Sequence, residues 1–408
     1  MAEISPRLKP QAWMKEASCR AVMKALTAKG GEARFVGGVV RDALLKRPVK
    51  DIDIATPLLP AEVMKRLKSA KLKAIPTGLD HGTVTAVAGK RHYEITTLRR
   101  DVKTYGRHAE VEFAADWAED AVRRDFTMNA LFLDADGNVF DYVDGLADLK
   151  TGRVRFVGDP ATRIREDVLR LLRFYRFFAH YGKTVPDGPA RLACRTLAYL
   201  LPNLSGERIA AETLRLLAAP DPLPALAFMQ EDGVLSALLP EAAGLERLRN
   251  LVALESPSGF GPDPLRRLAA LIDRDADLVA SRLKFSAAQR ARLIELAAPP
   301  PLDFAGDAHA QRSALYHLGK ELYVDRVMLA AAAAGDTARL KPLLALAKKW
   351  KPVEFPLKGR DLTKLGMKPG PELGTLLHDL AAWWEAGDFK AKRKDCLAEA
   401  KRRRPKHG

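Results

Sequence analysis

The chain has 408 residues, of which 47% are hydrophobic, and it carries a formal net charge of +16. A hydrophobic fraction of this size supports folded cores and excludes wholesale disorder, and the length predicts about two to four domains. Three scattered cysteines cannot build a disulfide framework or a cysteine-based metal site, which favours a reducing compartment, and we expect the cytoplasm.

The composition also limits the possible partners. No secretory signal is found, and the longest apolar run, Val327–Ala334, is far too short to span a bilayer, so we expect no membrane partner. The positive charge suits a phosphate-rich partner, and charge alone does not separate nucleic acid from an anionic membrane surface. It is concentrated in the last 20 residues, Phe389–Gly408, which hold nine Lys or Arg against two acids.

The first third of the chain mixes strand-like and helix-like patterns. Helices are predicted at Val39–Leu45 and Pro60–Lys68, and the turn Asp136-Gly137-Asn138 predicts an antiparallel hairpin. From Asp159 onward helical periodicity takes over. The predicted strands are Phe35–Val36, Lys50–Ala55, Val84–Val87, His92–Thr97, Leu131–Leu133 and Val139–Tyr142.

We therefore expect an α+β fold in three parts. Residues 1–158 would form a head with helices and a mixed, largely antiparallel sheet. Residues 159–225 would form a helical neck, and residues 226–408 an elongated, all-α body and tail with a basic C-terminus. Trp383 and Trp384 fit core packing better than a platform for stacking bases.

Two aspartates alternate with isoleucines in Lys50-Asp51-Ile52-Asp53-Ile54. Because side chains alternate across a strand, Asp51 and Asp53 would share one face, with their backbones about 7 Å apart. A divalent cation relieves the repulsion between such carboxylates, and Mg²⁺ completes its oxygen shell with substrate phosphates. Such a site can activate a hydroxyl and stabilise a departing pyrophosphate. A polar edge strand is the alternative.

A glycine pair strengthens this interpretation. Gly37 and Gly38 follow a predicted strand and open a helix some 13 residues before the aspartates. Glycines there let backbone N–H groups approach a phosphate, and a helix N-terminus favours anions. Arg41, one turn into the helix, could pair with a phosphate oxygen.

The segment from Gly37-Gly38-Val39-Val40-Arg41-Asp42 to Asp51-Ile52-Asp53-Ile54-Ala55-Thr56 resembles the catalytic signature of polymerase β-type nucleotidyltransferases. More narrowly, it resembles the bacterial class II CCA-adding enzymes and their poly(A) polymerase relatives, through about residue 180. The resemblance implies that Asp51 and Asp53 bind Mg²⁺ and that Gly37, Gly38 and Arg41 contact the nucleotide. Glu94 occupies the place of the family's third carboxylate, which would act as a base or only orient the site.

Two further segments carry the resemblance. The polar segment from Arg99 to His108 stands where the family has a mobile loop needed for the final adenylation, although a plain surface loop has the same composition. Arg123-Arg124-Asp125-Phe126-Thr127-Met128-Asn129-Ala130 closely matches a family motif, which implies that Arg124 and Asp125 contact the nucleotide. Charge pattern alone would fit a surface salt-bridge cluster.

The span Asp159–Phe178 is predicted to be one helix that begins at an Asp N-cap. An Asp acceptor beside an Arg donor matches the Watson–Crick edges of cytosine and adenine, whereas uracil and guanine present the reverse pattern. The family's Glu-Asp-x-x-Arg motif matches Glu166–Arg170, which implies that Asp167 and Arg170 read the base. Arg173 and Arg176 match positions near the phosphates. A solvated face with i,i+3 and i,i+4 ion pairs is the alternative.

The resemblance implies template-independent addition of CMP, CMP and AMP from CTP and ATP to the 3′ end of tRNA. Poly(A) synthesis is disfavoured because Thr77–Thr85, which includes His81, follows the CCA-enzyme pattern. CC-only or A-only addition stays open, and a non-catalytic RNA-binding protein is the alternative from another class. Residues 226–408 are implied to hold the acceptor stem and TΨC arm. The sequence does not predict the oligomeric state.

Overall fold

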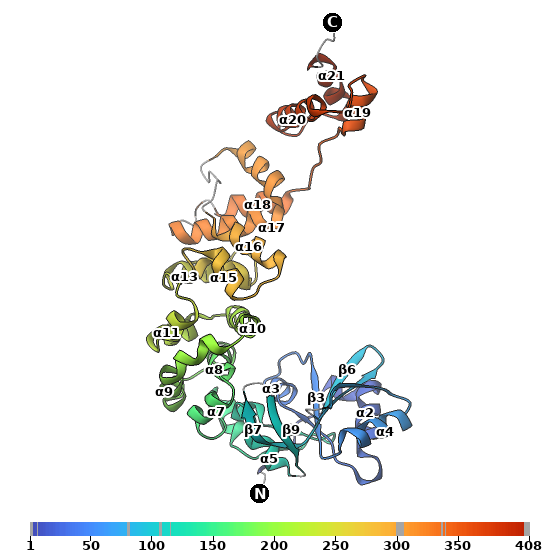
Figure 1. The fold of residues 1–408 in the computed structure, drawn as a ribbon, viewed down its shortest axis with the longest axis vertical. Coiled ribbons are helices and arrows are strands. Elements are labelled where there is room, and N and C mark those ends of the chain that lie inside the picture. The colour runs from blue at the N-terminus through green and yellow to red at the C-terminus, as the bar shows by residue number, and fades with distance from the viewer. Residues whose placement is uncertain are drawn as a thin grey trace. The chain divides into compact units, whose positions relative to one another are not determined.

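The computed structural model describes residues 3–5, 7–79, 82–105, 108–114, 116–298, 306–335, 338 and 340–403. The predictions that fall on His81, on Gly106 and Arg107, and on residues 404–408 lie outside these ranges. The chain divides into two compact units, one formed by Met1–Ala242 with Ser281–Phe285 and the other by Ala243–Ala280 with Ser286–Gly408 (Figure 1). The three-part division at residues 158 and 225 stays a prediction.

The first unit is built on an eight-stranded mixed sheet with the strand order β1-β10-β9-β2-β3-β6-β5-β4. Every neighbouring pair is antiparallel except β3 and β6, which run parallel. The strands are β1 (Glu3–Ser5), β2 (Arg34–Val36), β3 (Ile52–Thr56), β4 (Lys73–Gly78), β5 (Thr83–Ala88), β6 (Arg91–Thr97), β9 (Phe132–Leu133) and β10 (Val139–Asp141).

The sheet confirms the largely antiparallel prediction, including the hairpin of β9 and β10 around Gly137. Strand β4 was not predicted, because it is an edge strand that contains Pro76 and buries none of its residues fully. The segment predicted as a loop from Arg99 instead contains two strands, β7 (Arg99–Tyr105) and β8 (His108–Phe113), which pair as a separate antiparallel ribbon.

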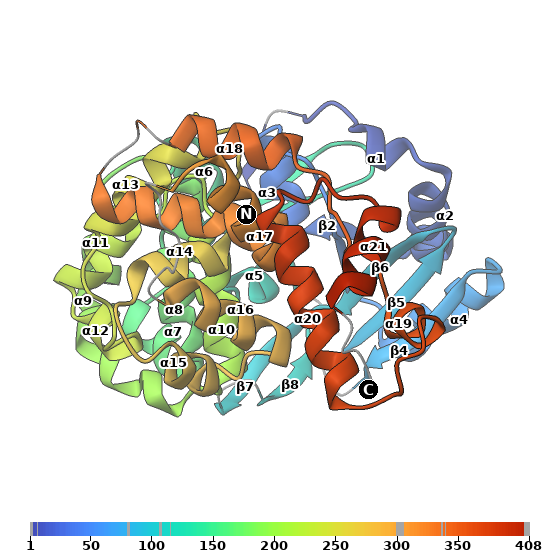
Figure 2. The same cartoon turned by 90° about the horizontal axis from the view of Figure 1, so that it is seen from above.

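Helices cover the sheet and continue the first unit. Helices α2 (Ala17–Thr27) and α4 (Pro60–Ser69) contact each other and pack at the β4–β5 end of the sheet (Figure 2). The others are α1 (Ala12–Lys15), α3 (Gly38–Leu44), α5 (Trp117–Val122), α6 (Gly145–Thr151), α7 (Pro160–Glu166), α8 (Leu169–Tyr181), α9 (Gly188–Leu197), α10 (Gly206–Leu217), α11 (Leu223–Glu231), α12 (Val234–Leu238) and the 3₁₀ turns Ala28–Gly30, Thr127–Asn129 and Ala198–Asn203.

The prediction of one helix over Asp159–Phe178 is wrong at its centre. Asp159 does cap α7 by accepting the N–H of Thr162 at 2.8 Å. However, α7 ends at Glu166, and Asp167 is extended, with φ −149° and ψ 105°. The Asp167 carboxylate accepts the N–H of Leu169 at 3.2 Å, a local bond of the kind that competes with helix continuation.

The regular secondary structure of the second unit, among its described residues, consists of helices joined by loops. Trp384 is 3% exposed in a core with Leu376 and Leu380, and Trp383 packs against that core, which confirms the expected packing role. No helix among the described residues is long and apolar enough to cross a membrane. The helices are α13 (Glu246–Glu255), α14 (Pro264–Leu271), α15 (Ala276–Arg282), α16 (Ala287–Ala297), α17 (Ala308–Ala334), α18 (Leu340–Lys349), α19 (Gly359–Lys364), α20 (Pro371–Ala386) and α21 (Arg393–Arg403).

A buried ion cluster joins three helices of the second unit. Glu255 of α13 accepts from Arg266 at 2.9 Å and from Arg267 at 2.6 Å, both on α14. Arg266 also donates to Asp325 of α17 at 2.9 Å. All four side chains are at most 5% exposed. Removing one carboxylate from such a cluster leaves buried cations without compensation.

We expect Glu255→Ala to lower the free energy of unfolding of this unit by about 3–5 kcal/mol, because two buried guanidinium groups lose their shared acceptor. Urea denaturation followed by circular dichroism measures the loss. The matched control, Glu246→Ala at an exposed position of the same helix, should stay within about 0.5 kcal/mol of the parent. A loss below about 1 kcal/mol in Glu255→Ala would contradict the role of the cluster.

Candidate active site

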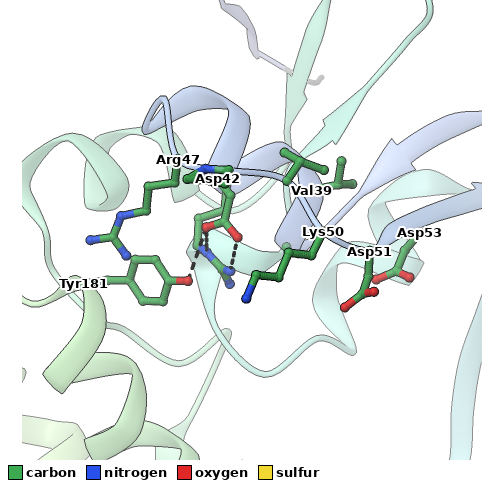
Figure 3. A pocket seen from close by; sticks show the side chains of 11 residues that line it. Val39, Asp42, Arg47, Lys50, Asp51, Asp53 and Tyr181 are labelled. Carbon is green, nitrogen blue, oxygen red and sulfur yellow. Dashed lines mark hydrogen bonds and ion pairs between the residues drawn. The ribbon is translucent and has the colours of Figure 1, made fainter. Parts of the chain in front are cut away.

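A cavity of about 570 Å³ opens beside α3 and the start of β3. The carboxylates of Asp51 and Asp53 lie side by side at one end of it, as the sequence predicts (Figure 3). Asp53 lies within β3 between the buried Ile52 and Ile54, while Asp51 directly precedes the strand. The lining residues are Gly38, Val39, Arg41, Asp42, Arg47, Pro48, Val49, Lys50, Asp51, Asp53 and Tyr181.

The parallel pairing of β3 and β6 places a third carboxylate next to this pair. Asp53 is the register partner of Glu94. Burial, followed by the charges of Glu94 and Asp51, raises the pKa of Asp53 to about 6, and the charge of Arg124 offsets part of this rise. The structure therefore brings Asp51, Asp53, Glu94 and Arg124 together, although it does not test whether Glu94 is a base or only orients the site.

This donor set fits a divalent cation. The oxygens are hard ligands, and the crowding that raises the pKa of Asp53 would be relieved by a bound positive charge. Within the described ranges, no group of three or more His, Cys, Asp or Glu residues is arranged to hold a metal ion by itself. Water and substrate phosphates would have to complete the coordination shell around Asp51 and Asp53.

The glycine pair shapes the start of α3. Gly37 has φ 74°, a left-handed conformation that favours glycine, and its N–H donates to the carbonyl of Leu131 at 3.1 Å. No side chain caps the helix that follows, so its first N–H groups have no side-chain acceptor. A Cβ on Gly37 would lie 3.6 Å from Nη1 of Arg124, which places this predicted nucleotide-binding arginine beside the glycines.

A chain of hydrogen bonds links α3 to α8. Arg41 donates from Nη1 to Oδ1 of Asn129 at 2.6 Å, and Asn129 donates from Nδ2 to Oδ1 of Asp125 at 3.0 Å. Nε of Arg173 donates to Oδ2 of Asp125 at 2.8 Å. Arg176, one turn further along α8, lies 2.6 Å from a carboxylate oxygen of Glu212.

The hydrogen bonds of this network hold Asp125 as an anion. Burial alone would raise its pKa, but the charge of Arg173 and the hydrogen bonds from Asn129, Arg173 and the N–H of Phe126 lower the pKa to about 2. Its oxygens are thus engaged by protein donors, and Asp125 positions Arg173. Direct contact between Asp125 and a nucleotide stays a prediction.

The two predicted base-reading residues bind other partners. Arg208 of α10 donates from Nη2 to both oxygens of Asp167, at 3.0 and 2.9 Å. Nη1 of Arg170 donates to Glu166 at 2.5 Å. Asp167 therefore does not pair with Arg163 or Arg170, as a surface ion-pair pattern would require; Glu166 is the acceptor of both arginines. The base-reading role itself stays a prediction.

Sequence reasoning missed several residues at this site. Arg208 and Glu212 follow helical spacing on α10, and nothing in their local pattern reveals the partner across the fold. Arg47 and Lys50 line the cavity and could have been selected for their nearness to Asp51 in the chain. Tyr181 donates its hydroxyl to Oδ1 of Asp42 at 3.2 Å, a contact that only the fold reveals.

The raised pKa of Asp53 predicts a stability cost. Between its ordinary value of 3.8 and about 6, the folded protein holds a proton that the unfolded chain lacks, so the free energy of unfolding falls as pH rises through this window. In a metal chelator, we expect Asp53→Asn to be more stable than the parent at pH 7 by about 1–3 kcal/mol. The difference should vanish near pH 4.

Denaturant titrations across that pH range provide the measurement. Asp136→Asn is the control, because it makes the same substitution at a side chain that is 78% exposed on a turn. A gain in Asp53→Asn that is the same at pH 4 and pH 7 would rule out the electrostatic origin of the cost.

Comparisons with known proteins agree with this geometry. Residues 33–155 match the family described as "Poly A polymerase head domain", and residues 189–245 match "Probable RNA and SrmB- binding site of polymerase A". The chain is 34% identical to the mitochondrial CCA tRNA nucleotidyltransferase 1 of Mus musculus over 396 residues, which are 91% of this chain and 87% of that protein. It is 33% identical to a CCA-adding enzyme of Lactobacillus delbrueckii, covering 87% and 90% of the two chains.

A solved structure is also similar. The crystal structure of the Bacillus stearothermophilus CCA-adding enzyme in complex with CTP superposes with a TM-score of 0.76 at 28% identity, covering 95% of this chain and 96% of that chain. The match extends across both the mixed-sheet head and the helical remainder, as the predicted fold class requires. The chain therefore belongs to the CCA-adding enzymes of the polymerase β-type nucleotidyltransferase superfamily.

Proposed function

We propose that this protein is a CCA tRNA nucleotidyltransferase that adds CMP, CMP and AMP from CTP and ATP to tRNA 3′ ends without a template and releases pyrophosphate. The observation that carries this proposal is the pair Asp51 and Asp53, which lines a cavity together with the start of α3, with Glu94 as the register partner of Asp53 and Arg124 close enough to lower the pKa of Asp53. Relatives named CCA tRNA nucleotidyltransferase and CCA-adding enzyme, and the CTP complex of the Bacillus enzyme, support it.

The residues divide the chemistry between them. Asp51 and Asp53 would hold divalent metal, which we propose is Mg²⁺, and the bound metal supplies activation of the RNA 3′-hydroxyl and charge stabilisation at the leaving pyrophosphate. Glu94 is placed to orient Asp53 or to accept a proton. The N–H groups at Gly38 and the guanidinium of Arg124 face the same region, where they would bind the triphosphate.

Base choice falls to the segment between α7 and α8. The break at Asp167 releases this carboxylate from a regular helix, and Arg208 and Glu166 fix Asp167 and Arg170 respectively. Held in this way, an acceptor and a donor would match cytosine and adenine and would reject uracil and guanine. Arg173 and Arg176 would complete the positive surface toward the phosphates.

The remaining proposals concern RNA binding and location. The helical part of residues 226–408 would bind the acceptor stem and TΨC arm mainly through shape and phosphates. A reducing compartment, for which we propose the cytoplasm, is consistent with three buried free cysteines.

Substitution of either metal-binding carboxylate tests the chemistry. We expect Asp51→Ala or Asp53→Ala to lower kcat by at least about 10³-fold, because the charge that holds the metal is lost. RNA affinity, measured by filter binding, should change by less than about threefold. The control Asp136→Ala should retain full activity. Unchanged turnover in either active-site variant would remove the metal assignment.

The product defines the enzyme within its family. Three tRNA transcripts, ending before CCA, after C and after CC, are incubated with each NTP and Mg²⁺. We expect ordered addition that stops at CCA. CC-only or A-only extension would identify a divided pathway, continued A addition a poly(A) polymerase, and no extension an RNA-binding protein without this activity.

Asp167→Ala tests base reading separately. We expect discrimination between CTP and UTP to fall by about 10–100-fold, because an acceptor worth about 1–3 kcal/mol is lost, while triphosphate affinity changes little. Competition between CTP and UTP on the transcript lacking CCA gives the ratio. Retained strict selection in Asp167→Ala would refute the role of this carboxylate.

A further inference from the structure

The end of the cavity opposite the aspartates is basic and aromatic. In Figure 3, Arg47 and Tyr181 lie at this end, and Lys50 lies between them and the Asp51–Asp53 pair. These three residues line the same cavity as the two carboxylates. Arg47 and Lys50 belong to the turn between α3 and β3, and Tyr181 is the last residue of α8.

The two cations at this end are not neutralised by any carboxylate that the structure describes. The guanidinium of Arg47 donates to the carbonyl of His180 at 2.9 Å and lies 4.5 Å from the ring centroid of Tyr181. Among the described residues, Arg47 has no carboxylate partner, and Lys50 makes no ion pair or hydrogen bond. Both side chains are exposed to the solvent that fills the cavity.

The other arginines of the site differ in this respect. Arg41 pairs with Asp42 at 2.9 Å, Arg124 with Asp120 at 2.7 Å, and Arg173 with the carboxylate of Asp125. Each of these arginines has a carboxylate partner, although Arg124 shares Asp120 with Arg123, so they act mainly as oriented hydrogen-bond donors. Arg47 and Lys50 retain a full positive charge that an incoming anion can neutralise.

The surroundings keep this end positive. The ring centroid of Tyr181 lies 4.2 Å from the guanidinium of Arg41, which pairs with Asp42, and 4.5 Å from that of Arg47, whose charge the ring does not cancel. Burial lowers the pKa of the neighbouring His180, and the charges of Arg176, Arg47 and Arg41 lower it further. A positive field within a concave site attracts an anion.

The reaction proposed above requires two phosphate-bearing substrates at one pair of carboxylates. The start of α3 at Gly38, together with Arg124, is assigned to the triphosphate. The RNA must bring its terminal 3′-hydroxyl to the same carboxylates from a different direction, and its last phosphodiester then lies within one nucleotide of Asp51. At the basic end of the cavity, Arg47 and Lys50 are available to bind that phosphodiester.

We propose that Arg47 and Lys50 form a binding subsite for the last phosphodiester of the RNA 3′ end, with Tyr181 as the residue that positions Arg47. This inference rests on the proposed function, because it names the substrate group bound beside the same catalytic carboxylates. No base contact is involved, so the subsite would serve RNA ends before CCA, after C and after CC equally.

Single-turnover kinetics on a tRNA transcript ending in CC test the subsite. We expect Arg47→Gln and Lys50→Gln each to weaken RNA binding about tenfold and to reduce the slope of log affinity against log salt concentration by about 1, with little change in the KM for ATP. Lys46→Gln is the matched control, since it removes the same charge from the same turn outside the cavity lining.

A modified RNA identifies the phosphate. Replacing the last phosphodiester of the transcript by an uncharged methylphosphonate should weaken binding to the parent protein about tenfold, and should have no further effect on an Arg47→Gln/Lys50→Gln double variant. An equal loss in parent and double variant would overturn the proposal. So would a rise in the KM for ATP that matches the loss of RNA affinity, since the subsite would then belong to the triphosphate.

Two Tyr181 variants separate positioning from packing. Tyr181→Leu should weaken RNA binding as Arg47→Gln does, whereas Tyr181→Phe, which keeps the ring, should retain the parent affinity. If both variants behave as the parent does, Tyr181 does not position Arg47. A parent protein that extends no RNA would contradict the proposed function itself, whereas an active parent with unaffected variants would contradict only the subsite.

Discussion

The structure of the site depends on one constraint: guanidinium groups must be concentrated where two polyanionic substrates meet, and buried guanidinium groups require compensation. At Arg123, Arg124, Arg173 and Arg176 the chain meets it with carboxylates that are more deeply buried than the arginines they hold. Asp120, at 1% exposure, accepts from both Arg123 and Arg124, and Glu212, at 3%, lies against Arg176. The donors are thereby oriented before a substrate arrives, which lowers the cost of reorganisation during the reaction.

The catalytic carboxylates differ from these arginines, because their charges are not paired in the same way. Asp51, Asp53 and Glu94 are brought together with no ion pair to any described cation, and Arg124 offsets only part of the repulsion that raises the pKa of Asp53. The folded protein tolerates this because the same β3 buries Ile52 and Ile54 on its other face. Because side chains alternate across the strand, one face of this short segment packs in the core while the other presents carboxylates that a metal ion could bind. Burial of the isoleucines thus offsets the repulsion between the carboxylates within the same segment.

This difference explains how much could be predicted from the sequence. The aspartate strand, the glycine turn and the Asp159 cap are local features, encoded by residues at most a few positions apart, and the structure contains each of them. The break at Asp167 was missed because its partner Arg208 lies on α10, a separate helix. The helical periodicity around Asp167 is strong, and the neighbouring sequence does not reveal that its carboxylate binds an arginine on a distant helix.

The balance of charge around the cavity follows from the same physics. An arginine with a carboxylate partner has fixed hydrogen-bond donors but attracts an anion only weakly. This suits a triphosphate, which must be aligned and whose pyrophosphate must then leave. A lysine or arginine without a carboxylate partner attracts an anion more strongly but orients it less. This suits an RNA 3′ end, which enters with a different terminal base at each of three steps. Arg47 and Lys50 line the cavity beside Asp51 and have no carboxylate partner among the described residues, whereas Asp120 holds Arg124 and Asp125 holds Arg173, so the two tasks fall to different groups of cations.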